Sequence, residues 1–167
     1  LDYFPTPNGR YYHAFRHGPV SFLILDTGED KPDSSKEYSG LVDFDAYRAE
    51  QTQWLGRIVQ DEFFKTAKYR VVLMHMPPFM GEYGASQVCT LWSPILNEAS
   101  IDLMFCGHTH HFARIDPNES ANRYPILINA PDMVVQVEVS DSRLEATVKK
   151  ADGQVVDTVA VAPRSKG

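Results

Sequence analysis

The spacing of hydrophobic and polar residues changes several times along the chain, and each change predicts a new element. Residues 10–16 and 20–26 are rich in aromatic and branched side chains and are separated by a short His-Gly-Pro segment. Two strand-forming runs around such a turn predict a β-hairpin. Residues 28–43 are polar and contain proline and glycine, so we expect a long surface loop there.

A helical period begins after this loop. Between residues 45 and 65, apolar side chains recur at steps of three, four and seven, which aligns them on one stripe of an amphipathic helix. The side chains of this stripe are Tyr47, Trp54, Leu55, Ile58, Val59 and Phe63. Asp45 is the expected N-terminal cap. The continuous apolar run 71–74 follows without alternation, which is typical of a strand covered on both faces and indicates an α/β arrangement.

The order of helix and strand repeats once before the pattern becomes purely β. Prolines and glycines predict an irregular segment over residues 76–86, followed by a short helix near 91–99 and a short buried strand over 101–106. Beyond Pro131, three segments are alternating or rich in branched residues, and we expect them to form an antiparallel meander. These segments are 133–139, 144–149 and 155–161.

The composition limits the classes of protein that fit this pattern. The 167 residues are 43% hydrophobic, enough for the core of one domain, and no apolar run approaches the roughly 18 residues of a membrane-spanning helix. With 16 basic and 22 acidic residues the net charge is -6, which argues against nucleic acid as the main partner. Only Cys89 and Cys106 are available, so a disulfide-built scaffold is excluded although a single bridge is not. The chain begins at Leu1 without the features of a secretion signal, and we expect it to be a piece of a longer protein.

Histidines follow two of the predicted buried strands. His75 ends the run VVLMH, and His108 and His110 come after LMFC and Gly107. The carboxyl ends of strands in an open α/β sheet meet at one edge, so we expect the three histidines to converge. Imidazole favours zinc, iron, copper or manganese. Gly107 is expected to turn the backbone sharply, and histidines two apart in an extended segment would point the same way, one toward each of two neighbouring metal ions.

Other polar residues near these strands have simpler interpretations. Asp26 ends a predicted strand and either binds metal or caps the following turn, of which we favour the turn. Cys106 would be a good zinc ligand as a thiolate, yet its apolar surroundings favour a packed, inert thiol. Asp102 lies at the wrong end of its strand, and His111 is expected at the surface or behind the ligands. No G-x-S-x-G, P-loop or G-x-G-x-x-G motif occurs, which leaves metal chemistry as the favoured function.

The histidines resemble the later motifs of the calcineurin-like metallophosphoesterases. A V-x-x-H sequence ends at His75, and the G-H-x-H of residues 107–110 extends to Arg114 as G-H-x-H-x-x-x-R. The segment YYHAFRHGPVSFLILDT resembles the hairpin that follows the central motif in purple-acid-phosphatase-type members. The family fold is a sandwich of two mixed sheets between helical layers. The resemblance therefore implies that this chain forms the second half of an α/β/β/α sandwich, with mixed sheets, flanking helices and a C-terminal antiparallel β-meander.

The resemblance also implies a function and a set of ligands. In the family, a binuclear centre of iron, manganese or zinc ions activates a hydroxide that attacks the phosphorus of a phosphate ester. His75 and His108 would bind one ion and His110 the other, while no catalytic residue is assigned within this chain. Relatives of this type are commonly exported, and this analogy is what suggests a periplasmic or secreted location.

Three motifs that the family needs are absent from residues 1–167, namely D-x-H, the G-D whose aspartate bridges both ions, and G-N-H-[DE]. We therefore expect a single fragment, the C-terminal half of a catalytic domain, with an α/β part in residues 1–130 and the β-meander in residues 131–167. Three imidazoles without carboxylates should bind a single zinc-like ion weakly, so the isolated chain is expected to hydrolyse little or nothing. Half a sandwich would expose strand edges and apolar faces, which predicts self-association or binding to the missing half.

The sequence leaves two alternatives open. One is a non-catalytic module that binds a partner or a carbohydrate and whose histidines are incidental. The other, within the enzymes, is a mononuclear zinc hydrolase that uses Cys106, and the accessibility of that thiol would decide it. The loops over residues 28–43 and 79–90 carry no readable code for the substrate ester.

Overall fold

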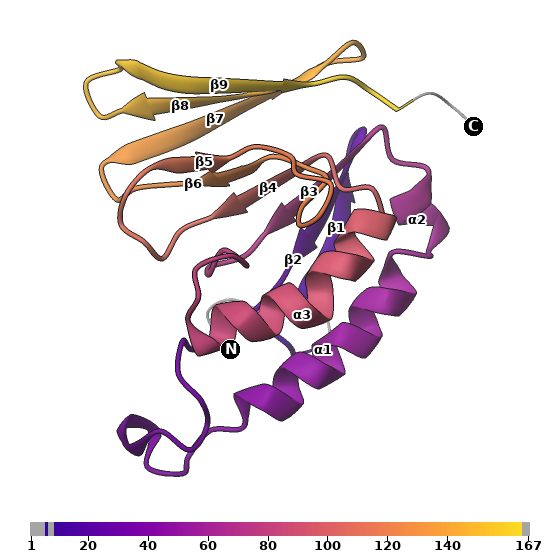
Figure 1. Ribbon diagram of the computed structural model, residues 1–167. Helices are drawn as coiled ribbons and strands as arrows, with labels where there is room; N and C mark the ends of the chain where they lie inside the picture. Colours follow the sequence, from indigo (N-terminus) through magenta and orange to yellow (C-terminus); the bar gives the residue numbers. More distant parts are fainter. Residues whose placement is uncertain (1–5, 7–8, 165–167) are drawn as a thin grey trace.

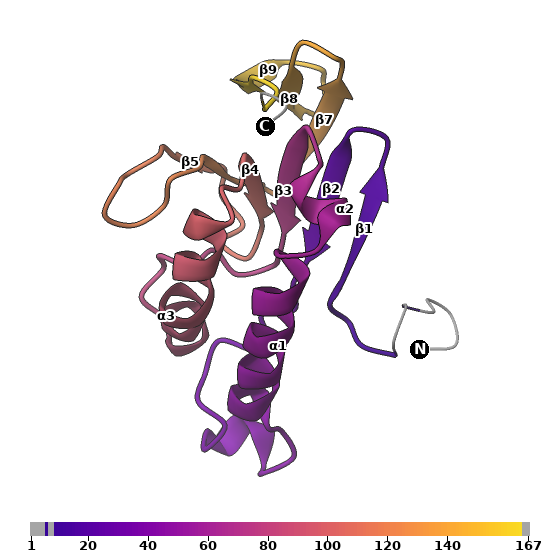
Figure 2. The same cartoon turned by 90° about the vertical axis from the view of Figure 1, so that its right-hand side faces the viewer.

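Two sheets and two long helices form the layers of this protein. The computed structural model describes residue 6 and residues 9–164. A six-stranded sheet has the order β1-β2-β3-β4-β6-β5, and a three-stranded sheet has the order β7-β8-β9. The helices cover one face of the large sheet and the small sheet lies against its other face (Figures 1 and 2). The predicted mixed α/β fold with flanking helices and a C-terminal antiparallel meander is therefore confirmed.

The predicted hairpin is confirmed and forms one side of the large sheet. β1 (His13–His17) pairs antiparallel with β2 (Val20–Ile24). Both strands are shorter than the predicted segments 10–16 and 20–26. β3 (Tyr69–Leu73) pairs parallel with β2, and β4 (Leu103–Cys106) pairs parallel with β3. Because these three strands are parallel, their carboxyl ends meet at one edge of the sheet.

The predicted helix over 45–65 is two helices. α1 (Phe44–Ile58) ends before residues 59–61, and a one-turn helix α2 (Glu62–Lys65) follows. The cap prediction was wrong, because Asp45 lies inside the first turn. The cap comes instead from Asp33 in the preceding loop, whose carboxylate accepts hydrogen bonds of 3.0 Å from the backbone N–H groups of Phe44 and Asp45. That loop also contains a short 3-10 helix, Lys36–Tyr38.

Helix α3 (Tyr83–Glu98) begins about two turns earlier than the predicted segment 91–99. Its early turns contain Gly84, a residue that disfavours a helix by itself. Gly84 is buried where the helix meets the loop after β2, and its N–H donates to the carbonyl of Asp30 at 3.0 Å. Close tertiary packing therefore starts the helix where local propensity does not. None of the helices among the described residues combines the length and the apolar character needed to span a lipid bilayer.

Two strands of the large sheet were not predicted. β5 (Ala113–Ile115) and β6 (Ile126–Ile128) have three residues each, too few to show a period. β6 pairs parallel with β4 and antiparallel with β5. The small sheet follows the predicted meander closely, with the strands β7 (Met133–Val139), β8 (Leu144–Lys150) and β9 (Val155–Val161).

The large sheet separates two hydrophobic cores. Val72 and Met104 face the helices and pack with Leu55 and Trp92, whereas their neighbours face the small sheet. The second core, between the two sheets, contains Val71, Leu103, Leu127, Leu144, Ala146 and Val148. Successive residues of β3 and β4 thus enter different cores, which explains why these strands show no polar alternation.

Candidate functional site

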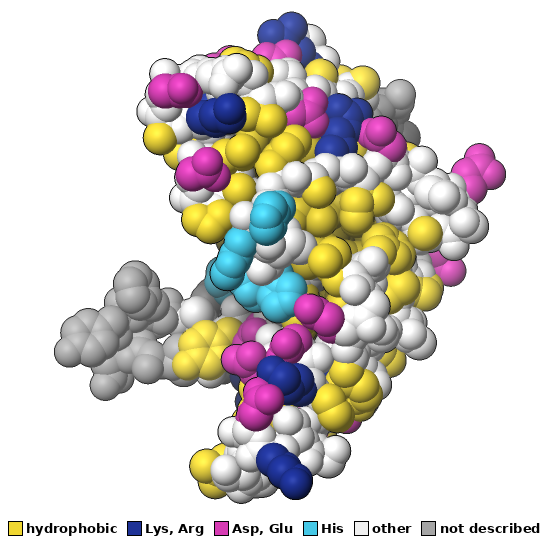
Figure 3. Space-filling model, turned by 60° about the vertical axis from the view of Figure 1, so that its left-hand side comes forward, with side chains coloured by type: hydrophobic (Ala, Val, Ile, Leu, Met, Phe, Trp, Pro, Cys, Tyr) yellow, Lys and Arg dark blue, Asp and Glu magenta, His cyan; other side chains and the backbone are white. Residues whose placement is uncertain are grey.

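His75 and His108 meet at the carboxyl edge of the large sheet. His75 lies just after β3 and His108 just after β4, and these strands are parallel neighbours. The Nδ1 atom of His108 lies 3.3 Å from the Nε2 atom of His75, with the two rings nearly perpendicular at 88°. Histidine side chains gather in a hollow on this face, beside acidic side chains (Figure 3).

The turn after β4 is made differently from the prediction. Gly107 is not in the left-handed region, whereas His108 and His110 are, with φ values of 72° and 60°. The expectations of a glycine turn and of an extended histidine segment were therefore wrong. A left-handed non-glycine residue costs about 1–2 kcal/mol, and such strain is concentrated at functional sites. A Cβ atom placed on Gly107 would lie 3.6 Å from Nδ1 of His75, an ordinary van der Waals contact, so this glycine borders the His75 ring without being required by crowding.

His110 is exposed, and the extended spacing that was expected to align it with His108 is not present. Within the part of the chain that the structure describes, no group of three His, Cys, Asp or Glu side chains is arranged to hold a metal ion by itself. The structure thus brings together two of the three predicted ligands, His75 and His108.

Glu82 is the site residue that the sequence analysis missed. Its Oε2 atom lies 2.7 Å from Nε2 of His108, on the side of the ring opposite His75. The side chain of His108 is 22% exposed and that of Glu82 is 40% exposed, so the pair is reachable from solvent. Glu82 is the N-cap residue of α3, directly after Gly81. Its only signal in the sequence is an acidic residue in a loop that starts at His75.

The spacing of the two ring nitrogens fits a single metal ion. Two imidazole nitrogens bound at about 2.0–2.1 Å to one tetrahedral ion lie roughly 3.3–3.4 Å apart. The observed 3.3 Å between His108 and His75 matches this separation. A ligating histidine commonly donates its other ring N–H to a carboxylate, and the 2.7 Å between Nε2 of His108 and Oε2 of Glu82 is a hydrogen-bond spacing that suits this arrangement. The pair therefore has the geometry of two ligands, to which further groups would have to be added.

The other residues considered at this edge are not placed to bind metal. Asp26 accepts a hydrogen bond of 3.0 Å from the backbone N–H of Gly28, so the turn that we favoured is confirmed. Cys106 is buried, and this burial raises the pKa of its thiol. An inaccessible thiol counts against the mononuclear zinc site. Cys89 and Cys106 are both free, so the bridge that the sequence left open is not formed.

Three further residues have other contacts. His111 is exposed and its Nδ1 lies 2.8 Å from the carbonyl oxygen of Thr109 in its own loop. Asp102 lies at the opposite edge of the sheet and accepts hydrogen bonds from the backbone N–H of Arg70 at 2.7 Å and from Arg164 at 2.6 Å. Burial raises the pKa of the Asp102 carboxyl, and Arg164 opposes that effect. Arg114, the last residue of the histidine motif, pairs with Asp116.

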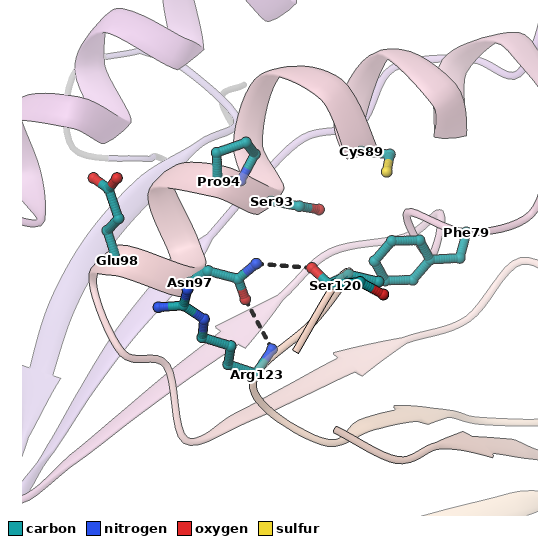
Figure 4. Close-up of a pocket in the computed structure, with 9 residues that line it drawn as sticks. Phe79, Cys89, Ser93, Pro94, Asn97, Glu98, Ser120 and Arg123 are labelled. Atoms are coloured by element: carbon teal, nitrogen blue, oxygen red, sulfur yellow. Dashed lines mark hydrogen bonds between the residues drawn. The ribbon is translucent and has the colours of Figure 1, made fainter. Parts of the chain in front are cut away.

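A pocket of about 540 Å³ lies apart from the histidines, between α3 and the loop before β6 (Figure 4). The amide of Asn97 closes one side of it, donating to the carbonyl of Ala121 at 2.7 Å and accepting from the N–H of Arg123 at 2.8 Å. None of the predicted ligands lines it. Its lining residues are Phe79, Cys89, Ser93, Pro94, Asn97, Glu98, Ser120, Ala121 and Arg123.

Comparison with solved structures shows what this fold is similar to. The chain matches the purple acid phosphatase PPD1 from yellow lupin (Lupinus luteus) seeds with a TM-score of 0.67 and 14% identity, over 95% of this chain and 34% of that chain. It matches GAP50, the anchor in the inner membrane complex of Plasmodium, with a TM-score of 0.61 and 16% identity, over 96% of this chain and 56% of that chain. No family model and no curated protein sequence matches the chain. The similarity shows a purple-acid-phosphatase-like fold, and the chain spans about a third and about half of these two structures.

Proposed function

We propose that this chain carries part of the metal centre of a phosphoesterase. The single observation that supports this most is the pair of nitrogens on His75 and His108, 3.3 Å apart at the carboxyl edge of a phosphatase-like fold. His75 and His108 would hold one ion, and His110 would contribute to a second. The ions would be iron, manganese or zinc, which imidazole nitrogens favour.

Two such ions lower the pKa of a bound water and neutralise the oxygens of a phosphoryl group. The residues of this chain position the ligand atoms for that chemistry. His75 and His108 present ring nitrogens just after neighbouring strands, and Oε2 of Glu82 lies 2.7 Å from Nε2 on the far side of the His108 ring. Uncharged imidazoles do not offset the charge of two dications, so the centre needs carboxylates from elsewhere.

We further propose that residues 1–167 are the C-terminal half of a catalytic domain, with the α/β part in residues 1–130 and the β-meander in residues 131–167. The missing acidic ligands would lie in the other half. The short coverage of the phosphatase structure, 34% of that chain, supports this proposal. The substrate would be a phosphate ester that the two halves enclose together.

An exposed apolar surface is the proposed contact for that other half. β7 is an edge strand, and its residues Val137 and Val139 lie opposite the buried Ala146 and Leu144, on the face that encloses the second core. They are nevertheless 41% and 40% exposed. Phe15 of β1 is 42% exposed and stacks on Phe22, which packs against the same core. An open strand edge beside apolar side chains favours the addition of another strand.

In the absence of the other half, we expect the isolated chain to self-associate through this surface. V137K places a charge on the inward face and is expected to shift the chain toward monomer in light scattering at high concentration. V134K is the matched control, because Val134 is on the same strand but faces outward and is 63% exposed. A strictly monomeric unmodified chain, or an equal effect of both variants, would contradict this contact.

Metal titration tests the proposed centre. We expect the isolated chain to bind zinc weakly, and H75A or H108A to weaken that binding at least about tenfold, the usual scale for losing a supporting group or ligand. H17A is the control, because His17 is exposed in the hairpin and lies level with the start of β3, whereas His75 follows its end. With manganese, iron or zinc added, the isolated chain should turn over little or no aryl phosphate ester. Unchanged zinc affinity in both ligand variants would overturn the metal site, and robust turnover would overturn the incomplete centre.

A non-catalytic binding module is the alternative function. The observation that favours it is the similarity to GAP50, an anchor protein, over 96% of this chain. In that case the histidines would be incidental, and the zinc affinity would not depend on His75 or His108. The same titration therefore separates the two functions.

A further inference from the structure

We infer that Glu82 is a positioning residue that fixes the tautomer of His108, so that the Nδ1 lone pair of this ring faces His75. The inference rests on the proposed function for its purpose, but its geometry does not depend on a metal. An ionised carboxylate only accepts hydrogen bonds. With Oε2 of Glu82 at 2.7 Å, the proton of a neutral His108 ring belongs on Nε2. Nδ1 is then the unprotonated nitrogen and can accept a hydrogen bond from Nε2 of His75, which lies 3.3 Å away.

The place of Glu82 in helix α3 indicates that its side chain does not serve the helix. Glu82 is the N-cap residue with extended dihedral angles, φ -71° and ψ 159°, yet its side chain makes no capping hydrogen bond. Serine, threonine, aspartate and asparagine are the residues that cap helices well. Glutamate at this position therefore provides no capping hydrogen bond, and its carboxylate contacts His108 instead.

The surrounding backbone compensates for the missing cap. The N–H of Gly84, in the first turn of α3, donates to the carbonyl of Asp30 at 3.0 Å, so the loop after β2 satisfies one of the free helix donors. Gly81, with φ at 80°, turns the chain immediately before the helix. The helix start is thus held by tertiary contacts, which leaves the Glu82 side chain available to the histidine.

Because serine caps a helix better than glutamate, the substitution E82S distinguishes a role of Glu82 in positioning His108 from a role in stabilising α3. If Glu82 only stabilised the helix, E82S would be harmless or favourable to every property, because serine is the better cap. If Glu82 positions His108, E82S should keep or raise the melting temperature and at the same time disturb the ring. Stability and metal affinity would then move in opposite directions.

The test reads the His108 tautomer directly by nitrogen-15 NMR of the metal-free chain and then measures zinc affinity. In the unmodified chain we expect the proton on Nε2. E82S should give a mixture of tautomers, no loss of melting temperature, and zinc affinity about 10- to 100-fold weaker, the effect of losing a carboxylate behind a ligating histidine. E82Q retains an accepting oxygen and should keep the tautomer. E98S, at the other end of the same helix, is the matched control and should change neither property.

Each result decides between the claims. If His108 keeps its proton on Nε2 in E82S, Glu82 does not position the ring, and the inference is wrong whatever the chain binds. If the tautomer changes and zinc affinity falls, both the inference and the proposed metal site are supported. If the tautomer changes while zinc affinity stays the same, Glu82 still positions His108, but the proposed function fails because the metal does not use that nitrogen.

Discussion

G84A is expected to lower the free energy of unfolding by about 2–4 kcal/mol, the scale of an overpacked buried position. Gly84 lies in the first turn of α3, and a Cβ atom there would collide with the backbone carbonyl oxygen of Glu29. The same atom would lie 2.7 Å from Cε of Met76 and 3.0 Å from Nη2 of Arg48. The carbonyl of Glu29 cannot withdraw freely, because it accepts a hydrogen bond of 2.5 Å from Arg48. Urea unfolding followed by circular dichroism measures the loss.

G56A is the matched control, because Gly56 is also a helical glycine, in α1, and nothing lies within 4 Å of a Cβ atom placed there. Alanine favours a helix over glycine by about 0.8–1 kcal/mol, so this variant should gain nearly that amount. The two substitutions are chemically identical and should have opposite signs. If G84A raised the free energy of unfolding or left it unchanged, the loop after β2 would be able to shift at little cost, contrary to the packing described.

R48A is expected to cost about 3–5 kcal/mol of unfolding free energy, since it leaves buried carbonyl groups without donors and opens a cavity. Arg48 is completely buried. Its Nε donates to the carbonyl of Thr27 at 2.9 Å, its Nη2 to that of Glu29, and its Nη1 to the carboxylate of Asp45 at 3.1 Å. R48K should recover only part of the loss, because an ammonium group does not reproduce the planar fork of donors.

R57A is the control for this prediction, because Arg57 is an exposed arginine in the last turn of the same helix and its loss should change stability by less than about 0.5 kcal/mol. The double variant R48A/G84A should lose less than the sum of the single losses, because both substitutions act on the Glu29 carbonyl. Strict additivity would show that the two residues are not coupled. Both substitutions are expected to displace the start of α3, which should weaken the Glu82–His108 contact in each.

Much of the sheet could be predicted because the burial of a strand produces a recognisable pattern of apolar residues in its sequence. The β3 and β4 strands lie between two cores, so Val71 and Val72 are both buried and the run is continuously apolar. The meander alternates because one of its faces is solvated. The position of His75 and His108 after these strands indicated their approach, since parallel neighbouring strands end at the same edge of a sheet.

The tertiary structure alone decided the details that make this edge a candidate site. The partner of His108 is Glu82, 26 residues away, and nothing local distinguishes this glutamate from the other acidic residues. Asp33 caps α1 from the preceding loop, and the packing of Gly84 starts α3 two turns early. The sequence by itself determined the hairpin, the strands β3 and β4 and the meander, because their patterns repeat over neighbouring residues. It did not determine the cap, the Glu82–His108 contact or the left-handed histidines, because those depend on contacts between segments that no local pattern records.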